Sequence, residues 1–220
     1  MTKRQLEIFR ELDASDLTAD IGCDHGVLSL ELLVSNKAKN IISTDISQKC
    51  LIKTVMLLEQ NGYTDRAEFV CADGLPSQFN PDQILIAGLG GLEICKILAQ
   101  YFEQNPNRPK LVLQPMKDLN IVREFLNRIG YKIIADRIFE DRKFYTIIKA
   151  ELGQQTLTKR QINFGAIEYE YTQDAYVAWL NEKIEKIQDI LQKTSKNNSK
   201  YEELSQILNE CNQIKGLKKC

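Results

Sequence analysis

The segment ADIGCDHGVL, residues 19–28, constrains the fold of this chain more than any other stretch. It ends a short apolar run over residues 17–21, crosses a loop bounded by Gly22 and Gly26, and enters a helical pattern at Val27. A strand that turns through glycines into a helix is typical of doubly wound α/β sheets, which bind nucleotide-like ligands at their carboxyl edge. We expect both glycines to adopt positive φ and to let a ligand approach the backbone.

The charge of this loop indicates which ligand it binds. A dinucleotide site has the spacing G-x-G-x-x-G and places a pyrophosphate at the helix N-terminus. Here the glycines are four residues apart and Asp24 lies between them, with Asp20 at the strand end. Carboxylates repel phosphate and favour a cationic, phosphate-free nucleoside such as S-adenosyl-L-methionine. An ordinary tight turn is the alternative. The cofactor-binding residues predicted in this loop are Asp20, Gly22, Cys23, Asp24, His25 and Gly26.

Two further strands are predicted to end on acids. Residues 40–45 form an apolar, β-branched run that ends on Asp45, about 20 residues past the glycine loop, where an acidic residue binds ribose hydroxyls in nucleotide-binding folds. Residues 67–71 form the next strand, and Asp73 follows it. We expect Asp73 to accept from an adenine amino group, although Asp-Gly turns are common everywhere. The cofactor-binding set predicted here is Asp45, Ile46, Ala72, Asp73 and Gly74.

The fourth strand, residues 82–87, opens onto a glycine-rich segment from Gly88 to Gly91, and the fifth, residues 110–114, ends on Gln114-Pro115. Three glycines among four residues leave the backbone open, so that a flat group can lie against it, and Gly88 is also assigned to the cofactor. Close packing of a helix on a strand is the alternative explanation for these glycines.

The order of the elements predicts the fold class. Five strands alternate with helices at about residues 3–12, 27–35, 48–61, 92–102 and 119–129. Residues 131–139 and 144–150 then form an antiparallel hairpin, joined by the polar link 140–143. This order indicates a Rossmann-like, seven-stranded class I methyltransferase sheet over residues 1–150, a form of the α/β doubly wound fold.

From residue 151 the pattern is helical. Apolar residues recur at three- and four-residue steps on both sides of the polar segment 193–200, which predicts a coiled-coil-like helical hairpin over residues 151–220. The positions are Val177, Leu180, Ile184, Ile187, Leu191, Leu204, Ile207, Cys211 and Ile214.

Composition narrows the class of protein. The chain is 43% hydrophobic and 27% charged with a formal net charge of −1, as in a soluble globular protein, and has no apolar run long enough for a membrane span. Its six cysteines are scattered without a C-x-x-C pair, and His25 is its single histidine. This pattern predicts neither a metal site nor a disulfide framework, and favours a reduced cytoplasmic protein.

Three motifs give the chain a resemblance to a known family. ADIGCDHG at residues 19–26, AGLGG at 87–91 and LQP at 113–115, with a helical C-terminal extension, resemble the bacterial tRNA adenine-N1 methyltransferases that modify adenine 22 in the D-arm. The resemblance extends to about residue 215. It implies S-adenosyl-L-methionine as cofactor, tRNA as substrate, and a helical hairpin that helps to hold the tRNA.

The implied reaction is in-line attack of adenine N1 on the sulfonium methyl, with the base turned out of its stack. Because neutral adenine N1 carries a lone pair, position and electrostatics matter more than a strong base. We expect Gly88, Leu89, Gly90, Gln114 and Pro115 to form the catalytic pocket. For several other residues the sequence does not decide between a contact with the cofactor or tRNA and a purely structural role. These residues are His25, Lys3, Arg4, Tyr145, Trp179, and the tyrosines Tyr169, Tyr171 and Tyr176.

Two other functions fit parts of this pattern. One is a small-molecule methyltransferase whose helical tail is a dimer interface or lid, and the other is a non-enzymatic cofactor-binding protein whose hairpin binds a protein partner. Residues 151–220 contain ten Lys or Arg and ten Asp or Glu, so the hairpin has no net charge to favour RNA. We expect a monomer or a weak homodimer.

Overall fold

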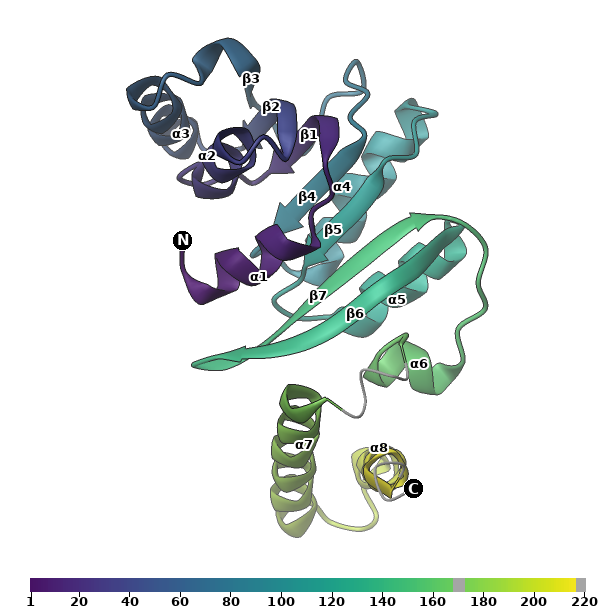
Figure 1. The fold of residues 1–220 in the computed structure, drawn as a ribbon. Helices are drawn as coiled ribbons and strands as arrows, with labels where there is room; N and C mark the ends of the chain where they lie inside the picture. Colours follow the sequence, from purple (N-terminus) through teal and green to yellow (C-terminus); the bar gives the residue numbers. More distant parts are fainter. Residues whose placement is uncertain (168–172, 217–220) are drawn as a thin grey trace.

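The computed structural model describes residues 1–167 and 173–216 and contains one seven-stranded sheet (Figure 1). The strand order is β3-β2-β1-β4-β5-β7-β6. β1 to β5 are parallel, and β7 is antiparallel to both β5 and β6. The predicted fold class is thereby confirmed. The strands are β1 (Ser15–Ile21), β2 (Ala38–Asp45), β3 (Ala67–Cys71), β4 (Gln83–Ala87), β5 (Lys110–Gln114), β6 (Tyr131–Asp141) and β7 (Lys143–Leu152).

Helices cover both faces of the sheet because its central strands are apolar on both sides. In β4, Ile84 and Ile86 pack in the cluster with α4 and α5, whereas Leu85 packs in the cluster with α1, α2 and α3. Figure 1 shows α4 and α5 behind the sheet and α1 and α2 in front of it. The helices are α1 (Lys3–Glu11), α2 (Val27–Val34), α3 (Gln48–Gln60), α4 (Gly91–Gln104) and α5 (Leu119–Arg128), with a 3-10 turn, η1 (Thr64–Arg66).

The parallel strands all end at one edge of the sheet. β1 lies between β2 and β4, so the strand order reverses there, and the crevice at such a reversal is where open α/β sheets bind ligands. The glycine loop after β1 and the segment after β4 both start at this edge. The topology therefore brings the predicted cofactor and catalytic segments together.

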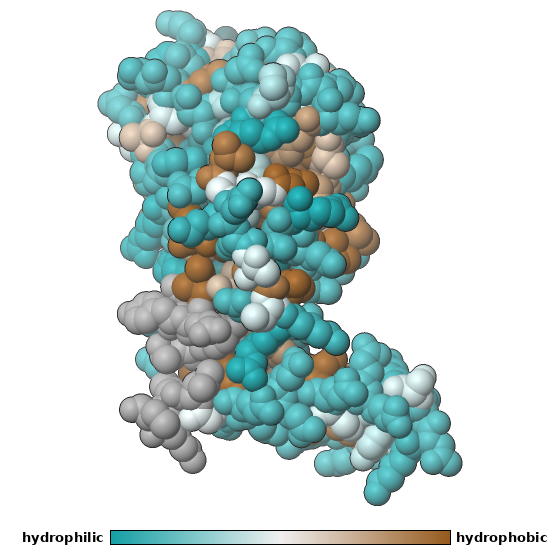
Figure 2. All heavy atoms as spheres, turned by 90° about the vertical axis from the view of Figure 1, so that its right-hand side faces the viewer, coloured by the Kyte–Doolittle hydropathy of each residue, from teal (hydrophilic) through white to brown (hydrophobic). Residues whose placement is uncertain are grey.

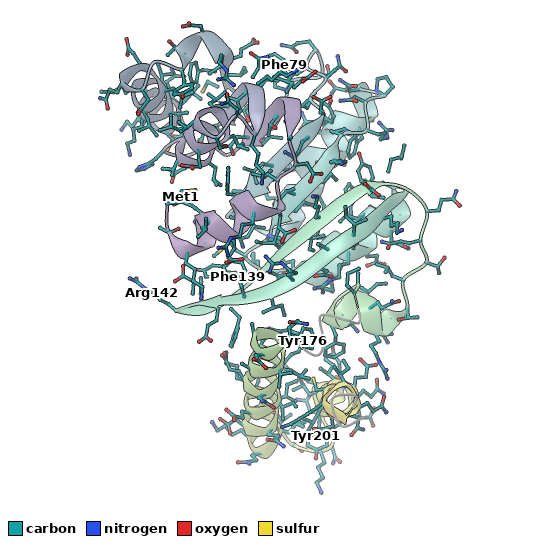
Figure 3. The ribbon with its side chains drawn as sticks, viewed as in Figure 1. Met1, Phe79, Phe139, Arg142, Tyr176 and Tyr201 are labelled. Carbon is teal, nitrogen blue, oxygen red and sulfur yellow. The ribbon has the colours of Figure 1, made fainter. Side chains whose placement is uncertain are left out.

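The hairpin of β6 and β7 is longer than predicted. Pairing continues to Asp141 opposite Lys143, so the expected link over residues 140–143 shrinks to Arg142, which has a φ of 62°. Ile138 packs with α7 and Phe139 with α1, so both faces of the ribbon are covered and its ladder can extend. Figure 3 shows Arg142 at the far tip of this ribbon.

The predicted C-terminal helices are present as α7 (Asp174–Lys193) and α8 (Ser199–Gly216). Leu180, Ile184 and Ile187 of α7 are buried together with Cys211 and Ile214 of α8, as the periodicity predicts. The same cluster includes Ile138 of β6, so the hairpin packs against the sheet ribbon as well as on itself. β7 runs to Leu152, and the domain boundary at residue 150 stays a prediction.

A short helix that we did not predict, α6 (Lys159–Phe164), links the two parts. Thr158 and Gln161 form a capping box at its start. Buried Arg123 of α5 makes a two-pronged ion pair with buried Asp136 of β6, at 2.7 and 3.0 Å, and also donates to the carbonyl of Ile162 in α6. This network fixes α6 against the sheet. Figure 3 shows Tyr176 at the end of α7 nearest to the sheet.

Candidate functional site

The loop from β1 to α2 has the backbone geometry that its glycines predict. Gly22, Asp24 and Gly26 all have positive φ, at 72°, 51° and 70°. Gly26 caps α2 and does not line the cavity described below; a Cβ there would lie 2.5 Å from Cγ2 of Thr54. Gly26 is therefore required for close packing on α3, not for ligand approach as we expected.

Asp20 at the end of β1 is 4% exposed. It accepts a hydrogen bond from the Ser29 hydroxyl at 2.7 Å, and Ser29 also contacts the Ser43 hydroxyl at 2.9 Å. Burial, together with the nearby charge of Asp45, raises the pKa of Asp20 to about 6, against the opposing hydrogen bonds from Ser29. A cationic ligand beside Asp20 stabilises the ionised form of this carboxyl group.

Asp45 at the end of β2 organises the loop. One carboxylate oxygen accepts from the backbone N–H of Asp24 at 3.0 Å, and the other accepts from that of Ser47 at 2.8 Å. Cys23, between Gly22 and Asp24, is buried, and burial raises the pKa of its thiol to about 12, so it stays neutral. His25 is exposed, with Nε2 at 3.3 Å from Asp24 Oδ1 and 3.2 Å from Lys53 Nζ.

Asp73 follows β3 at the same edge and forms an ion pair with Lys96 of α4, at 3.0 Å. Both side chains are about half exposed, and exposed pairs of this kind hold together weakly. The carboxylate therefore remains open to another donor. Ala72 and Gly74 flank it and line the cavity with it.

The segments after β4 and β5 are bound to each other by their backbones. Gly88 donates to the carbonyl of Gln114 at 3.0 Å, and Met116 donates to that of Leu89 at 2.8 Å. Gln114 is fully buried, its Nε2 donates to the carbonyl of Pro115, and its Oε1 has no partner among the residues that the structure describes. Gly88 and Leu89 line the cavity described below, whereas Gly90, Gln114 and Pro115 are not part of its wall.

These segments surround one cavity of about 500 Å³. Its wall includes most of the predicted cofactor-binding residues and the predicted catalytic residues Gly88 and Leu89. It also includes residues that sequence reasoning did not assign, from α1, α2, α4 and the last residues of β1 and β4. The predicted members are Asp20, Gly22, Cys23, Asp24, His25, Asp45, Ile46, Ala72, Asp73, Gly74, Gly88 and Leu89; the unassigned ones are Gln5, Ile8, Ile21, Val27, Leu28, Ala87, Glu93 and Ile97.

The sequence did not decide whether Arg4 and Lys3 of α1 contact the site. Arg4 is part of the cavity wall, whereas Lys3 is exposed and is not. The Arg4 guanidinium lies 5.6 Å from the ring centroid of Tyr145, and its Nη1 lies 3.8 Å from the sulfur of Met116. The amphipathic pattern of residues 3–12 could have indicated that Arg4 lies near the site, because an amphipathic helix packs one face against the sheet.

The other candidate contacts are in the C-terminal part. Trp179 lies beside Tyr176 with ring centroids 5.2 Å apart, and Tyr176 is buried. Tyr169 and Tyr171 lie outside the described residues. Within residues 1–167 and 173–216, no helix is long and apolar enough to cross a membrane, and no group of three His, Cys, Asp or Glu side chains is placed to hold a metal ion.

Comparisons with known proteins indicate the family of this chain. The TrmK family, described as tRNA (adenine(22)-N(1))-methyltransferase, matches residues 18–215. The chain is 36% identical over 156 residues to a candidate tRNA methyltransferase of Mycoplasma genitalium, covering 68% of this chain and 69% of that protein. It is 28% identical over 169 residues to the Bacillus subtilis tRNA (adenine(22)-N(1))-methyltransferase, covering 76% and 71%.

A solved structure of Mycoplasma capricolum TrmK in complex with S-adenosyl-homocysteine has the same fold, with a TM-score of 0.89 at 24% identity over 98% of each chain. The family match covers both the sheet and the C-terminal helices. On this evidence the chain belongs to the TrmK family of tRNA (adenine(22)-N(1))-methyltransferases.

Proposed function

We propose that the cavity at the carboxyl edge of the sheet binds S-adenosyl-L-methionine, with the target adenine of tRNA beside Gly88 and Leu89. As a TrmK member, the chain is a tRNA adenine-N1 methyltransferase that uses this cofactor. The observation that carries the residue assignment is that Asp20, Asp45 and Asp73, from the ends of three neighbouring strands, line one cavity.

The charges on the cavity wall fit this cofactor. The wall has five carboxylates, Asp20, Asp24, Asp45, Asp73 and Glu93, whereas Arg4 is its one Lys or Arg side chain in the described part of the chain. A sulfonium and an ammonium are stabilised by such a surface, and a pyrophosphate is repelled. This excess of acids over bases argues against a nicotinamide dinucleotide.

Three of these acids have separate tasks in this proposal. Asp45 accepts from the ribose hydroxyls and at the same time holds the glycine loop in place. Asp73 exchanges its exposed contact with Lys96 for the adenine amino group of the cofactor. Asp20 supplies a buried negative charge close to the cationic end of the ligand.

When bound, the cofactor supplies an electrophilic methyl group on a positively charged sulfur. The lone pair of adenine N1 needs no prior loss of a proton, so the work of this chain is to position the base and stabilise its new positive charge. The Gly88 and Leu89 backbone forms one side of the base site. We assign the unpartnered Oε1 of Gln114 to the amino group of the target adenine, reached when the neighbouring segment 115–118 adjusts.

Family membership favours tRNA over the two other functions considered from the sequence. Contact between the C-terminal helices and tRNA is part of the proposal, as is a monomer or weak homodimer. A tRNA substrate also supports the predicted cytoplasmic location.

Methyl transfer tests the function. Labelled S-adenosyl-L-methionine is incubated with the full chain and unmodified bacterial tRNA, or the same tRNA with guanine in place of adenine 22. Transfer to the first and none to the second is expected, and no transfer to any tRNA contradicts the activity. Calorimetry tests the cofactor assignment independently of the activity: S-adenosyl-homocysteine is expected to bind, and NAD is not.

A further inference from the structure

A second cavity, of about 430 Å³, lies between the first turn of α5, the short helix α6 and the C-terminal helices α7 and α8. In Figure 1, α7 is seen from the side and α8 nearly end-on, so their axes are inclined to each other. The polar and aromatic side chains on its wall include Asn120, Phe164, Trp179, Lys183, Gln206 and Glu210. A volume of this size accepts a small organic ligand.

Besides the exposed Lys159 and Glu203, the wall has two partly buried charged groups whose interactions are incomplete. Lys183 of α7 is half-buried, with Nζ 4.8 Å from the ring centroid of Phe164 and 5.0 Å from that of Trp179. Among the described residues, no acid lies within ion-pairing distance of it, and burial lowers its pKa. Oε2 of Glu210 in α8 is buried and has no partner in the same part of the chain. A buried carboxylate oxygen without a donor is costly, so a ligand that supplies donors is favoured.

From this arrangement we propose that the second cavity receives another unpaired base of the tRNA, with guanine as the best fit. Guanine presents N–H donors next to a carbonyl oxygen. The donors match the free oxygen of Glu210, and the carbonyl matches the ammonium of Lys183. Trp179, which is only partly buried, offers aromatic surface, on which bases stack in single-stranded sites.

The position of the cavity also supports a tRNA ligand. Leu119 and Asn120 on its wall directly follow segment 115–118, which is bound to the loop after β4 by the Met116–Leu89 and Gly91–Lys117 hydrogen bonds. One short segment therefore links the walls of the two cavities, and a substrate as large as tRNA can contact both. The face of the C-terminal helices that Figure 2 shows is largely hydrophilic, so a polar ligand such as tRNA can approach it. The inference rests on the proposed function.

Trp179 is the single tryptophan of the chain, so its fluorescence reports on this cavity directly. The probes are GMP, AMP, CMP, UMP and unmodified tRNA, each titrated into the full-length protein. GMP and tRNA are expected to quench the emission saturably, and S-adenosyl-homocysteine is expected to leave it unchanged. If tRNA does not quench it, the inference is wrong.

A matched pair of lysines on α7 separates a pocket contact from general charge attraction. Lys183→Met removes a cation from the cavity wall, whereas Lys186→Met removes one from an exposed position that pairs with Glu182. Loss of a hydrogen bond from a charged donor typically costs enough to raise the KM for tRNA about tenfold. That rise is expected for Lys183→Met, with less than a twofold change for Lys186→Met and unchanged cofactor affinity in both.

Equal increases in the KM for tRNA in the two variants contradict the proposal that the second cavity binds a base of the tRNA. The proposed function still stands if methyl transfer persists, and is overturned separately if no tRNA is methylated. Glu210→Gln tests the choice of base, because it removes the second acceptor oxygen and the charge, and is expected to abolish a preference for GMP over AMP. Equal quenching by GMP and AMP in the unsubstituted protein contradicts the guanine assignment. This last measurement does not depend on any variant folding.

Discussion

Oδ2 of Asp45 accepts a hydrogen bond from the backbone N–H of Asp24 at 3.0 Å, and this contact joins the end of β2 to the middle of the glycine loop. Asp24 has a φ of 51°, an unusual conformation for a residue other than glycine. The bond to Asp45 offsets the cost of that conformation. The acid that we assign to the ribose therefore also shapes the loop before any ligand binds.

Asp45→Ala is expected to weaken the binding of S-adenosyl-homocysteine about 100-fold, because it removes both the ribose contact and the anchor of the loop. Each hydrogen bond to a charged group is worth about 1.5–3 kcal/mol. Asp45→Asn keeps one acceptor oxygen and is expected to fall between the alanine variant and the unsubstituted protein. Titration calorimetry measures these affinities. Asp16→Ala removes an equal charge at the opposite end of β1 and serves as control; equal loss in the two alanine variants contradicts the assignment.

Gly26 and Gly62 form a natural comparison for the cost of a side chain at positive φ. Their φ values are 70° and 74°, but a Cβ on Gly26 would collide with Thr54 whereas one on Gly62 would meet nothing within 4 Å. Gly62→Ala is expected to cost about 1 kcal/mol from backbone strain alone. Gly26→Ala adds overpacking and is expected to cost about 2–5 kcal/mol in total. Urea unfolding measures both, and equal costs show that α2 and α3 can separate freely.

Sequence reasoning located the strand ends well because local signals define them. Alternation and β-branched residues mark where β1, β2 and β4 run, and parallel strands end at one edge. Asp20, Asp45 and Asp73 could therefore be expected near one another without knowledge of any contact. The same argument placed Gly88 and Leu89 on the cavity wall.

The contacts that sequence reasoning missed join residues far apart in the chain. Arg4 reaches Tyr145 and Met116, and Arg123 pairs with Asp136, yet no local pattern specifies which acid a given arginine meets. Gln114 at the adenine edge stays a prediction, and no local pattern indicated that the β4–β5 pairing buries its side chain completely. Tertiary packing, which is invisible in a single sequence, decides these positions.

Asp20 is expected to make the stability of the protein depend on pH. Its pKa is about 6 in the folded chain, against an ordinary value of 3.8 for an exposed aspartate, so the folded state holds its proton more tightly. Ionisation therefore destabilises the fold, and the contribution of Asp20 is most favourable below pH 4 and is lost as the pH rises through 6. At pH 8 the full shift corresponds to about 3 kcal/mol.

Asp20→Asn removes this dependence and keeps an acceptor for Ser29. From pH 5 to pH 8, the free energy of unfolding of the variant is expected to rise by about 1–2 kcal/mol relative to that of the unsubstituted protein. Urea unfolding at both pH values measures this change. The same substitution is expected to weaken cofactor binding, because a cationic ligand loses its buried counter-charge. A constant stability difference across this range shows that Asp20 does not titrate there.

Arg4 is the one lysine or arginine on the wall of the first cavity within the described residues, so it is the best placed side chain there to hold a phosphate of the incoming tRNA. Arg4→Met is expected to raise the KM for tRNA about tenfold at low salt, with the affinity for S-adenosyl-homocysteine unchanged. Lys3→Met removes the same charge one residue away, from a side chain that is exposed and off the wall, and is expected to change KM less than twofold. Steady-state methylation at two salt concentrations distinguishes the roles, because a phosphate contact weakens as salt rises. If Arg4→Met instead lowers cofactor affinity and leaves the KM for tRNA unchanged, Arg4 belongs to the cofactor site, and the tRNA backbone approaches from another side of the cavity.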